Sequence, residues 1–148
     1  MKIAIGCDHA GFNLKQVVLK HLSGRDIELT DVGTYDKGSC HYPIYAQKVA
    51  HAVLSKQADL GILVCGTGIG MAIAANKVHG IRAATVSDCF TAAATRRHND
   101  ANVLCLGERT LGEGLACMVV DSFIFTEFEG GRHQTRVDMV NSIEGLGK

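Results

Sequence analysis

The chain has 148 residues, of which 47% are hydrophobic and 20% charged, and its formal net charge is zero. A chain of this length and composition is too apolar to be disordered and can bury one sizeable core, so we expect a single domain over residues 1–148. The balanced charge argues against nucleic acid or an anionic membrane as the main partner, because both bind basic surfaces.

The cysteines and the amino-terminal residues indicate a reducing compartment. No two of the six cysteines form a C-x-x-C pair, and the first residues lack the long apolar region of a signal peptide. A disulfide scaffold is also normally much smaller than this chain. We therefore expect a cytoplasmic protein with free thiols, in which Cys105 and Cys117 belong to the core.

Strand and helix patterns alternate five times along the chain. Continuous apolar runs predict strands at residues 2–6, 27–32, 60–64, 81–86 and 102–106. Helical spacings predict helices at residues 12–22, 42–55, 71–76, 90–97 and 112–125, followed by a weaker helix at 134–143. In the fifth helix, the apolar residues expected on one side are Leu115, Met118, Val119 and Phe123.

Strands that are apolar throughout are typical of a parallel sheet covered on both faces. Short links and right-handed crossovers then favour an open, doubly wound sheet of five strands in three layers, α/β/α. The expected fold is therefore Rossmann-like, with one extra helix at the carboxyl end. In such sheets, ligands bind beyond the carboxyl ends of the strands.

The most informative stretch is LVCGTGIGM, residues 63–71. Cys65 ends the third expected strand, and Gly66, Gly68 and Gly70 follow it before a helix of small residues. Backbone N–H groups and the positive end of a helix dipole stabilise a thiolate or hold an anion at such a point. A cysteine that ends a buried strand is more often a small core residue, but this loop favours a catalytic base beside an oxyanion site.

Three other interpretations of the glycine loop fail on spacing. A dinucleotide-binding fingerprint needs G-x-G-x-x-G after the first strand, whereas G-x-G-x-G follows the third strand here. A P-loop needs Gly-Lys-Ser/Thr, but Gly70 is followed by Met71. A cysteine phosphatase loop needs an arginine where Met71 stands. A loop whose backbone closely approaches a small anionic ligand remains.

Other reactive side chains follow strands that end at the same expected edge. Asp8 and His9 follow the first strand, Ser87 and Asp88 follow the fourth, and Arg109 follows the fifth. An aspartate at the end of a strand is commonly a helix cap, and we weigh a cap and a ligand contact equally for Asp8.

Two further clusters are expected at the opposite edge of the sheet. His98 and Asn99 precede the fifth strand, so they lie away from Cys65 within one chain. Arg132 and Arg136 share a helix face and suit a phosphate dianion. Their segment follows the fifth helix, however, and so begins at the edge of the sheet opposite Cys65. Each cluster alone is more often a solvated turn. A catalytic His98 has to reach the Cys65 of another subunit, and the arginines either do the same or return along the sheet.

These residues together resemble the type B ribose-5-phosphate isomerases, a family that also includes the galactose-6-phosphate isomerase subunits. The match extends over essentially the whole chain. Its motifs are Gly6-Cys7-Asp8-His9-Ala10-Gly11, Tyr42-Pro43, Cys65-Gly66-Thr67-Gly68-Ile69-Gly70, Ala74-Ala75-Asn76-Lys77, Gly80-Ile81-Arg82-Ala83, Arg96 with His98-Asn99-Asp100-Ala101-Asn102, and Glu129-Gly130-Gly131-Arg132-His133.

The resemblance implies interconversion of ribose 5-phosphate and ribulose 5-phosphate through a cis-enediolate, without a metal or other cofactor. This reaction belongs to the non-oxidative branch of the pentose phosphate pathway. Cys65 matches the base that removes the C2 proton, and Met71 stands where another branch of the family has a glutamate. His98 matches the group that assists opening of the sugar ring. One departure is His41, which stands where an aspartate is common.

The resemblance also implies the ligand contacts and the assembly. The residues that match contacts to sugar oxygens are Asp8, Thr67 and Asn99, and Thr67 is a candidate to move a hydroxyl proton. The residues that match phosphate ligands are His9, Arg109, Arg132 and Arg136. We expect the backbone of Gly66, Gly68 and Gly70 to hold the enediolate. The family's site is shared between two subunits, so a homodimer or tetramer is expected.

Two alternatives remain beside the pentose-phosphate isomerase. A galactose- or allose-6-phosphate isomerase uses the same chemistry in a pocket one carbon longer. A phospholigand-binding module without catalysis needs the glycine loop and the arginines but has no use for Cys65 or His98.

Overall fold

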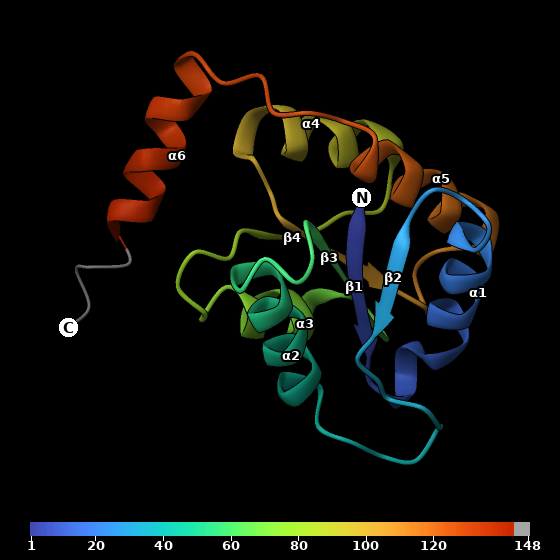
Figure 1. Ribbon diagram of the computed structural model, residues 1–148. Helices are drawn as coiled ribbons and strands as arrows, with labels where there is room; N and C mark the ends of the chain where they lie inside the picture. The colour runs from blue at the N-terminus through green and yellow to red at the C-terminus, as the bar shows by residue number, and fades with distance from the viewer. Residues whose placement is uncertain (144–148) are drawn as a thin grey trace.

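The computed structural model of the protein describes residues 1–143. Five parallel strands form one sheet in the order β2-β1-β3-β5-β4 (Figure 1). The strands are β1 (Lys2–Cys7), β2 (Glu28–Asp31), β3 (Leu60–Cys65), β4 (Ala83–Thr85) and β5 (Val103–Gly107). The helices are the short 3₁₀ turn η1 (His9–Gly11), α1 (Phe12–Leu22), α2 (Tyr42–Leu54), α3 (Ile69–Ala75), α4 (Cys89–Asn99), α5 (Glu113–Ile124) and α6 (Arg132–Ile143).

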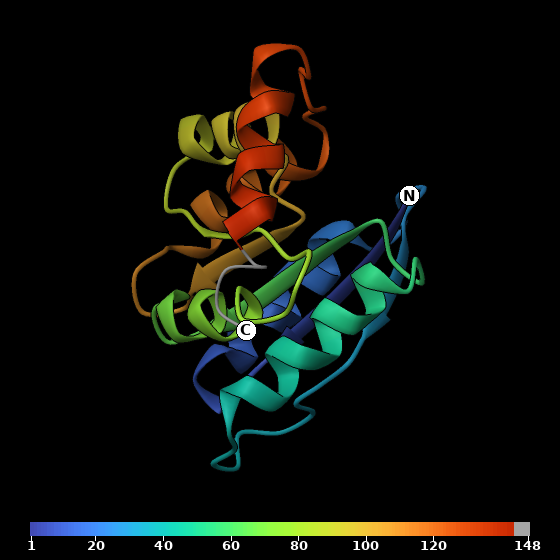
Figure 2. The ribbon, with the colours of Figure 1, turned by 90° about the vertical axis from the view of Figure 1, so that its left-hand side faces the viewer.

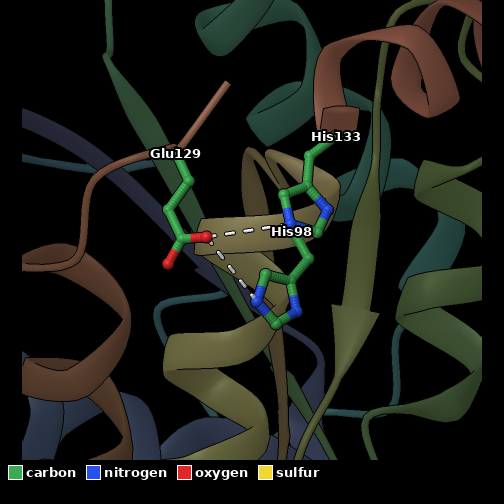
Figure 3. Close-up of side chains that lie close together, drawn as sticks. All are labelled: His98, Glu129 and His133. Atoms are coloured by element: carbon green, nitrogen blue, oxygen red, sulfur yellow. Dashed lines mark ion pairs between the residues drawn. The ribbon is translucent and has the colours of Figure 1, made fainter. Parts of the chain in front are cut away.

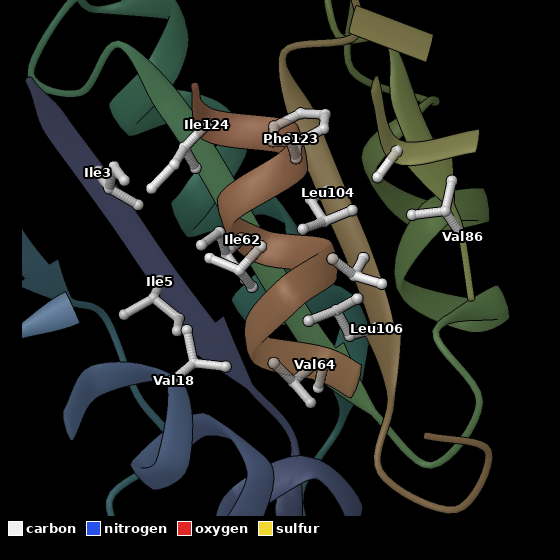
Figure 4. Packing of buried hydrophobic residues seen from close by; sticks show 14 of the residues in the cluster. Ile3, Ile5, Val18, Ile62, Val64, Val86, Leu104, Leu106, Phe123 and Ile124 are labelled. Carbon is white, nitrogen blue, oxygen red and sulfur yellow. The ribbon is translucent and has the colours of Figure 1, made fainter. Parts of the chain in front are cut away.

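The three-layer arrangement confirms the expected fold class (Figures 1 and 2). Helices α1, α4 and α5 cover one face of the sheet, and α2 and α3 cover the other. On the first face, α5 lays Phe123 and Ile124 over the apolar side chains of β1, β3 and β5 (Figure 4). Burial of this apolar area from both sides is the main force that holds the layers together.

Every predicted strand and helix is present; α1 has the predicted ends, and the others are shifted at one or both ends. Helix α3 begins at Ile69 rather than Met71, because Gly68 adopts a positive φ of 79° and the chain is helical directly after it. Strand β4 has three residues, fewer than predicted. The strands β1, β3 and β5 are buried almost throughout, whereas β2 and β4 are partly exposed because they form the edges of the sheet.

Two expectations about α5 were wrong. Leu115 and Met118 are 42% and 60% exposed, although Val119 and Phe123 are buried as expected. The buried stripe of this helix also includes Ala116 and Val120, so its centre is turned away from Leu115 and Met118. Cys117 is half-buried rather than part of the core, whereas Cys105 is fully buried, and all six cysteines are free thiols.

Helix α6 extends away from the three layers and contacts α4 (Figures 1 and 2). His133 and Val137 are its buried residues, and most of its other side chains face solvent. Among residues 1–143, no helix combines the length and the apolar character needed to cross a membrane.

Candidate active site

Backbone hydrogen bonds join three strand exits into one surface at the carboxyl edge of the sheet. The Asp8 N–H donates to the Val64 carbonyl at 3.2 Å, which ties the exit of β1 to β3. On the other side, the Glu108 N–H donates to the Cys65 carbonyl at 2.9 Å and the Arg109 N–H donates to the Gly66 carbonyl at 3.0 Å. The loops after β1, β3 and β5 therefore lie together, as expected for this fold.

The Cys65 thiol lies at the centre of this surface and is 6% exposed. The Gly68 N–H donates to its Sγ at 3.1 Å, so a backbone donor of the glycine loop contacts the sulfur directly. The glycine loop lies so close to β5 that a Cβ on Gly107 would stand 2.7 Å from the carbonyl carbon of Thr67. Thr67 itself is exposed, and its Oγ1 accepts a long hydrogen bond from the Ile69 N–H at 3.4 Å.

Asp8 and His9 lie beside the thiol loop. The Asp8 side chain is buried, and its Oδ1 accepts hydrogen bonds from the N–H groups of Ala10 and Gly11, so it does act as a cap for η1. Glycine is required at position 11 because the backbone of β3 approaches it closely: a Cβ there would lie 2.5 Å from the Val64 carbonyl. The His9 Nδ1 accepts from the Cys40 N–H at 3.3 Å, which assigns its proton to Nε2 as a donor for an anion.

Arg109 and Tyr42 border the glycine loop. The Arg109 guanidinium lies over Gly66, where an added Cβ would stand 3.4 Å from its Nε. The Tyr42 ring lies against Gly70, 3.2 Å from the position of an added Cβ. A positive charge and an aromatic wall thus flank the loop, and a negatively charged ligand beyond the strands would meet the guanidinium.

Asp88 has a structural role at the same edge. Its Oδ1 accepts from the Thr91 N–H at 2.8 Å and caps α4. Hydrogen bonds from the Thr91 side chain and backbone lower the pKa of the Asp88 carboxyl.

A second group of polar residues gathers where α4 meets α6 (Figure 3). The rings of His98 and His133 stack with their centroids 4.5 Å apart. Glu129 Oε2 lies 3.9 Å from His98 Nε2 and 3.7 Å from His133 Nε2. Burial lowers the pKa of His133, and the nearby charges of His98, Arg132 and Arg136 act in the same direction.

A cavity of about 560 Å³ opens beside this group. Its polar lining includes Asn76, Arg82, His98, Asn99, His133 and Arg136. Two arginines hold the turn before β5: Arg82 and Arg96 each donate to the Asp100 carboxylate at 2.8 Å. These two ion pairs fix the end of α4 and with it the position of His98.

The predicted site residues therefore fall into two groups within one chain. The carboxyl-edge group contains Asp8, His9, Cys65, Gly66, Thr67, Gly68, Gly70 and Arg109. The group at the α4–α6 junction contains His98, Asn99, Arg132 and Arg136. Cys65 pairs with Gly107, the last residue of β5. His98 instead lies in the chain before Val103, the first residue of β5. At about 3.3 Å per residue, the length of β5 separates these two ends by about 13 Å.

Sequence reasoning assigned no role to several residues that shape these groups. Lys15 is fully buried, and its position between Leu14 and Val18 on the apolar face of α1 was a readable signal. Glu129 and His133 belonged to a recognised motif, but their meeting with His98 depends on the path of the chain between α5 and α6. The contact of Cys40 with His9 joins residues 31 positions apart and had no local signal.

Known proteins resemble this chain over most of its length. Residues 3–140 match the Ribose/Galactose Isomerase family. Ribose-5-phosphate isomerase B of Escherichia coli is 50% identical over 143 residues, which cover 97% of this chain and 96% of that protein. The solved structure of ribose-5-phosphate isomerase B from Clostridium thermocellum superposes with a TM-score of 0.98 at 49% identity and full coverage of both chains.

A further solved relative carries a sugar phosphate. It is ribose-5-phosphate isomerase B of Mycoplasma genitalium with bound ribulose 5-phosphate, which superposes with a TM-score of 0.91 at 42% identity, over 97% of this chain and 96% of that one. The family match spans most of the chain, and the identity to these relatives holds over nearly the full length of both proteins. The chain therefore belongs to the ribose/galactose isomerase family.

Proposed function

We propose that the chain is a single-domain aldose–ketose isomerase that interconverts ribose 5-phosphate and ribulose 5-phosphate. The observation that carries the proposal is the Cys65 thiol at the carboxyl end of β3, with the Gly68 N–H 3.1 Å from its sulfur, in a member of this family. The names of its relatives, one of them with bound ribulose 5-phosphate, support the choice of substrate. This reaction would place the protein in the non-oxidative branch of the pentose phosphate pathway.

In the proposed reaction, the Cys65 thiolate takes the proton from C2 of the open-chain aldose. The electron pair of the broken C–H bond forms the C1–C2 double bond, and the aldehyde oxygen becomes the enediolate oxygen. Backbone N–H groups of the glycine loop are positioned near that charge, and each well-aimed donor contributes roughly 3–4 kcal/mol to transition-state stabilisation. A proton then moves between the two oxygens, with Thr67 or Asp8 as carrier, and Cys65 returns its proton to C1.

Ring opening needs a second group, for which we propose His98 of a neighbouring subunit. Histidine is the side chain most often used as a general acid and base, so it suits the transfer of a proton between the ring oxygen and the anomeric hydroxyl. The separation of His98 from Cys65 within one chain supports a site shared between two copies. Exposed apolar side chains on three helices near these groups suggest that this surface is covered in the assembly; they are Ile69, Ile73, Phe90, Met139 and Val140.

Phosphate binding is the proposed role of four cationic or donor side chains. Arg109 and His9 belong to the carboxyl edge, and Arg132 and Arg136 would come from the α6 of one of the subunits. A dianion held by several guanidinium groups supplies binding energy remote from the reacting carbons and fixes C2 near the thiol.

The test is the Cys65→Ala variant. We expect kcat to fall by about 10²–10⁴-fold, the usual contribution of a general base, while the dissociation constant for ribose 5-phosphate changes little. Cys117→Ala, which removes a half-buried thiol on α5, is the control and should keep its activity. Turnover of Cys65→Ala comparable to that of the unaltered protein would exclude Cys65 as the base.

A hexose 6-phosphate is the second candidate substrate, because the matched family includes galactose isomerases. The values of kcat/KM for ribose 5-phosphate, galactose 6-phosphate and allose 6-phosphate decide between them. Exchange of the C2 proton of ribose 5-phosphate with solvent separates either isomerase from a binding module without catalysis.

A further inference from the structure

Three potential metal ligands converge at the junction of α4 and α6. One ligand atom from each of His98, Glu129 and His133 lies within 4.8 Å of those of the other two residues. Both imidazoles direct a ring nitrogen toward the Glu129 carboxylate, which lies to one side of the stacked rings (Figure 3). The distances from Glu129 to the rings, 3.9 and 3.7 Å, exceed those of direct hydrogen bonds, so the three side chains lie together without bonding to one another.

The backbone fixes this convergence. The Glu129 N–H donates to the Arg97 carbonyl at 3.1 Å, which attaches the segment before α6 to α4 beside His98. Gly130 and Gly131 have φ values of 64° and 55°, and the His133 N–H donates to the Gly130 carbonyl at 3.0 Å. The two glycines thus allow the sharp turn that brings the side chains of residues 129 and 133 to the same side.

The spacing suits a small transition-metal ion. Zinc binds histidine nitrogen and carboxylate oxygen at about 2.0–2.2 Å, so ligand atoms of a tetrahedral site stand about 3.4 Å apart. The two distances to Glu129 exceed that value by a few tenths of an ångström, which rotation of exposed side chains can close. The side chains of His98 and Glu129 are 44% and 50% exposed, whereas His133 is 8% exposed and acts as the fixed ligand.

We propose that His98, Glu129 and His133 bind a divalent transition-metal ion such as Zn²⁺, with water at the remaining position. The proposed isomerisation uses no metal, but it shares one residue with this two-histidine, one-carboxylate set, namely His98. The ion would therefore act as a reversible inhibitor, because its bond to His98 Nε2 occupies the group proposed to open the sugar ring. The inhibition rests on the proposed function, whereas the binding of the ion does not.

The surrounding charges select the kind of ion. Arg132 and Arg136 lie near His133 and oppose any cation, so an ion held mainly by charge is disfavoured here. Zn²⁺, Co²⁺ and Ni²⁺ gain from the nitrogen lone pairs of imidazole, whereas Mg²⁺ and Ca²⁺ prefer oxygen ligands. The site should bind the first group and ignore the second.

The experiment uses the full-length protein after treatment with a chelator, with Co²⁺ as the spectroscopic probe and Zn²⁺ in calorimetry. We expect one ion per chain, with visible bands of a low-symmetry nitrogen and oxygen site. Glu129→Gln keeps the shape of the side chain and should weaken Zn²⁺ binding by at least about tenfold, since even changes outside the ligand shell cost that much. Glu127→Gln, an equal charge change at an exposed residue two positions earlier, should bind like the unaltered protein.

Three results would overturn the proposal. They are the absence of stoichiometric Zn²⁺ binding, equal affinity in Glu129→Gln, and a sulfur-to-cobalt charge-transfer band, which would locate the ion at a cysteine such as Cys40 or Cys65 instead.

Isomerase assays then test the consequence: Zn²⁺ should inhibit the unaltered protein and Glu127→Gln at concentrations about tenfold below those needed for Glu129→Gln. Isomerase activity without metal binding would reject this inference alone, and metal binding without isomerase activity would reject only the proposed function.

Discussion

The Lys15 side chain is fully buried beneath the loop that follows β2. Its ammonium donates to both carboxylate oxygens of Asp31 and to the Thr34 carbonyl, each at 2.7 Å. The loop after β2 leads to Cys40, which contacts His9, so this buried charge braces one side of the carboxyl-edge site. A buried ammonium is tolerated here because all three of its donors have oxygen partners.

Substitution of Asp31 and substitution of Lys15 should lower the free energy of unfolding by different amounts. Asp31→Asn removes the counter-ion of the Lys15 ammonium, whose side chain is fully buried. We expect this to cost about 3–5 kcal/mol in the free energy of unfolding. Lys15→Met should cost less, because the Asp31 side chain is 25% exposed and its charge can be solvated. Urea unfolding at fixed protein concentration measures both. Asp36→Asn, at an exposed carboxylate in the same loop, is the control, and equal losses in all three variants would contradict this explanation.

Cys7 links single-residue burial to the pH dependence of stability. Burial raises the pKa of its thiol to about 12, and the nearby Lys15 charge only partly opposes this. The folded state therefore holds the thiol proton more tightly than the unfolded state, whose cysteines titrate near ~8.5. The stability from this group is complete below that pH and is lost as the pH rises toward 12.

We expect the free energy of unfolding to fall by about 1.4 kcal/mol per pH unit from Cys7 above pH ~9, with a similar contribution from the buried Cys105, whose pKa is also raised by burial. Denaturant unfolding between pH 8 and pH 10.5 measures the slope. Cys7→Ala should show a shallower slope than the unaltered protein, whatever its stability at neutral pH. An unchanged slope would mean that Cys7 ionises equally in both states.

At the scale of elements, helix α2 begins without a side-chain cap. His41 occupies the N-cap position with extended backbone angles, and its side chain makes no capping hydrogen bond. Pro43 in the first turn has no N–H, and the Ile44 N–H donates only to the His41 carbonyl, at 3.2 Å, so Ile44 is the donor that a capping side chain at position 41 would accept from. The family resemblance indicated an aspartate as the common residue here, and an aspartate at an N-cap accepts such a bond.

His41→Asp should therefore stabilise the protein by about 1 kcal/mol, from the new hydrogen bond and from the favourable charge at the start of the helix. Thermal unfolding near pH 7 measures the effect. His41→Ala removes the imidazole without providing a cap and is the matched control. If both variants change the melting temperature equally, loss of the histidine rather than capping is the cause.

At the scale of the whole molecule, the sheet holds the two groups of site residues apart. The strands are parallel, so β3 presents Cys65 at one edge, while the connection from α4 to β5 holds His98 at the other. Helix α6 stands away from the layers and presents Arg132 and Arg136 on exposed surface. A rigid sheet cannot fold to close this gap, and for this reason we propose that a complete site takes residues from two copies of the chain.

Co-expression of Cys65→Ala and His98→Ala chains tests this arrangement. Each homodimer lacks one essential group in both of its sites and should be inactive. In a random mixture, half of the dimers are mixed, and each of these contains one intact site, so about a quarter of the unaltered activity should return. If the mixture stays as inactive as the separate variants, Cys65 and His98 do not act across an interface.

The amino-acid sequence by itself determined the order and type of every strand and α-helix in residues 1–143, because apolar periodicity reports directly on which face of each element is buried. It also identified the glycine loop, since local spacing decides whether a backbone can approach a ligand. It misjudged the buried side of α5 at Leu115 and Met118, because the angle at which a helix packs depends on its neighbours.

The tertiary structure alone decided which distant residues meet. Hydrogen bonds between loops join Asp8, Cys65 and Arg109 at one edge, and a turn at two glycines brings Glu129 and His133 to His98. Such meetings depend on strand order and on the path of the connections, which no local pattern encodes. The candidate base was therefore readable from nine consecutive residues, whereas the candidate metal ligands became visible only once the chain was folded.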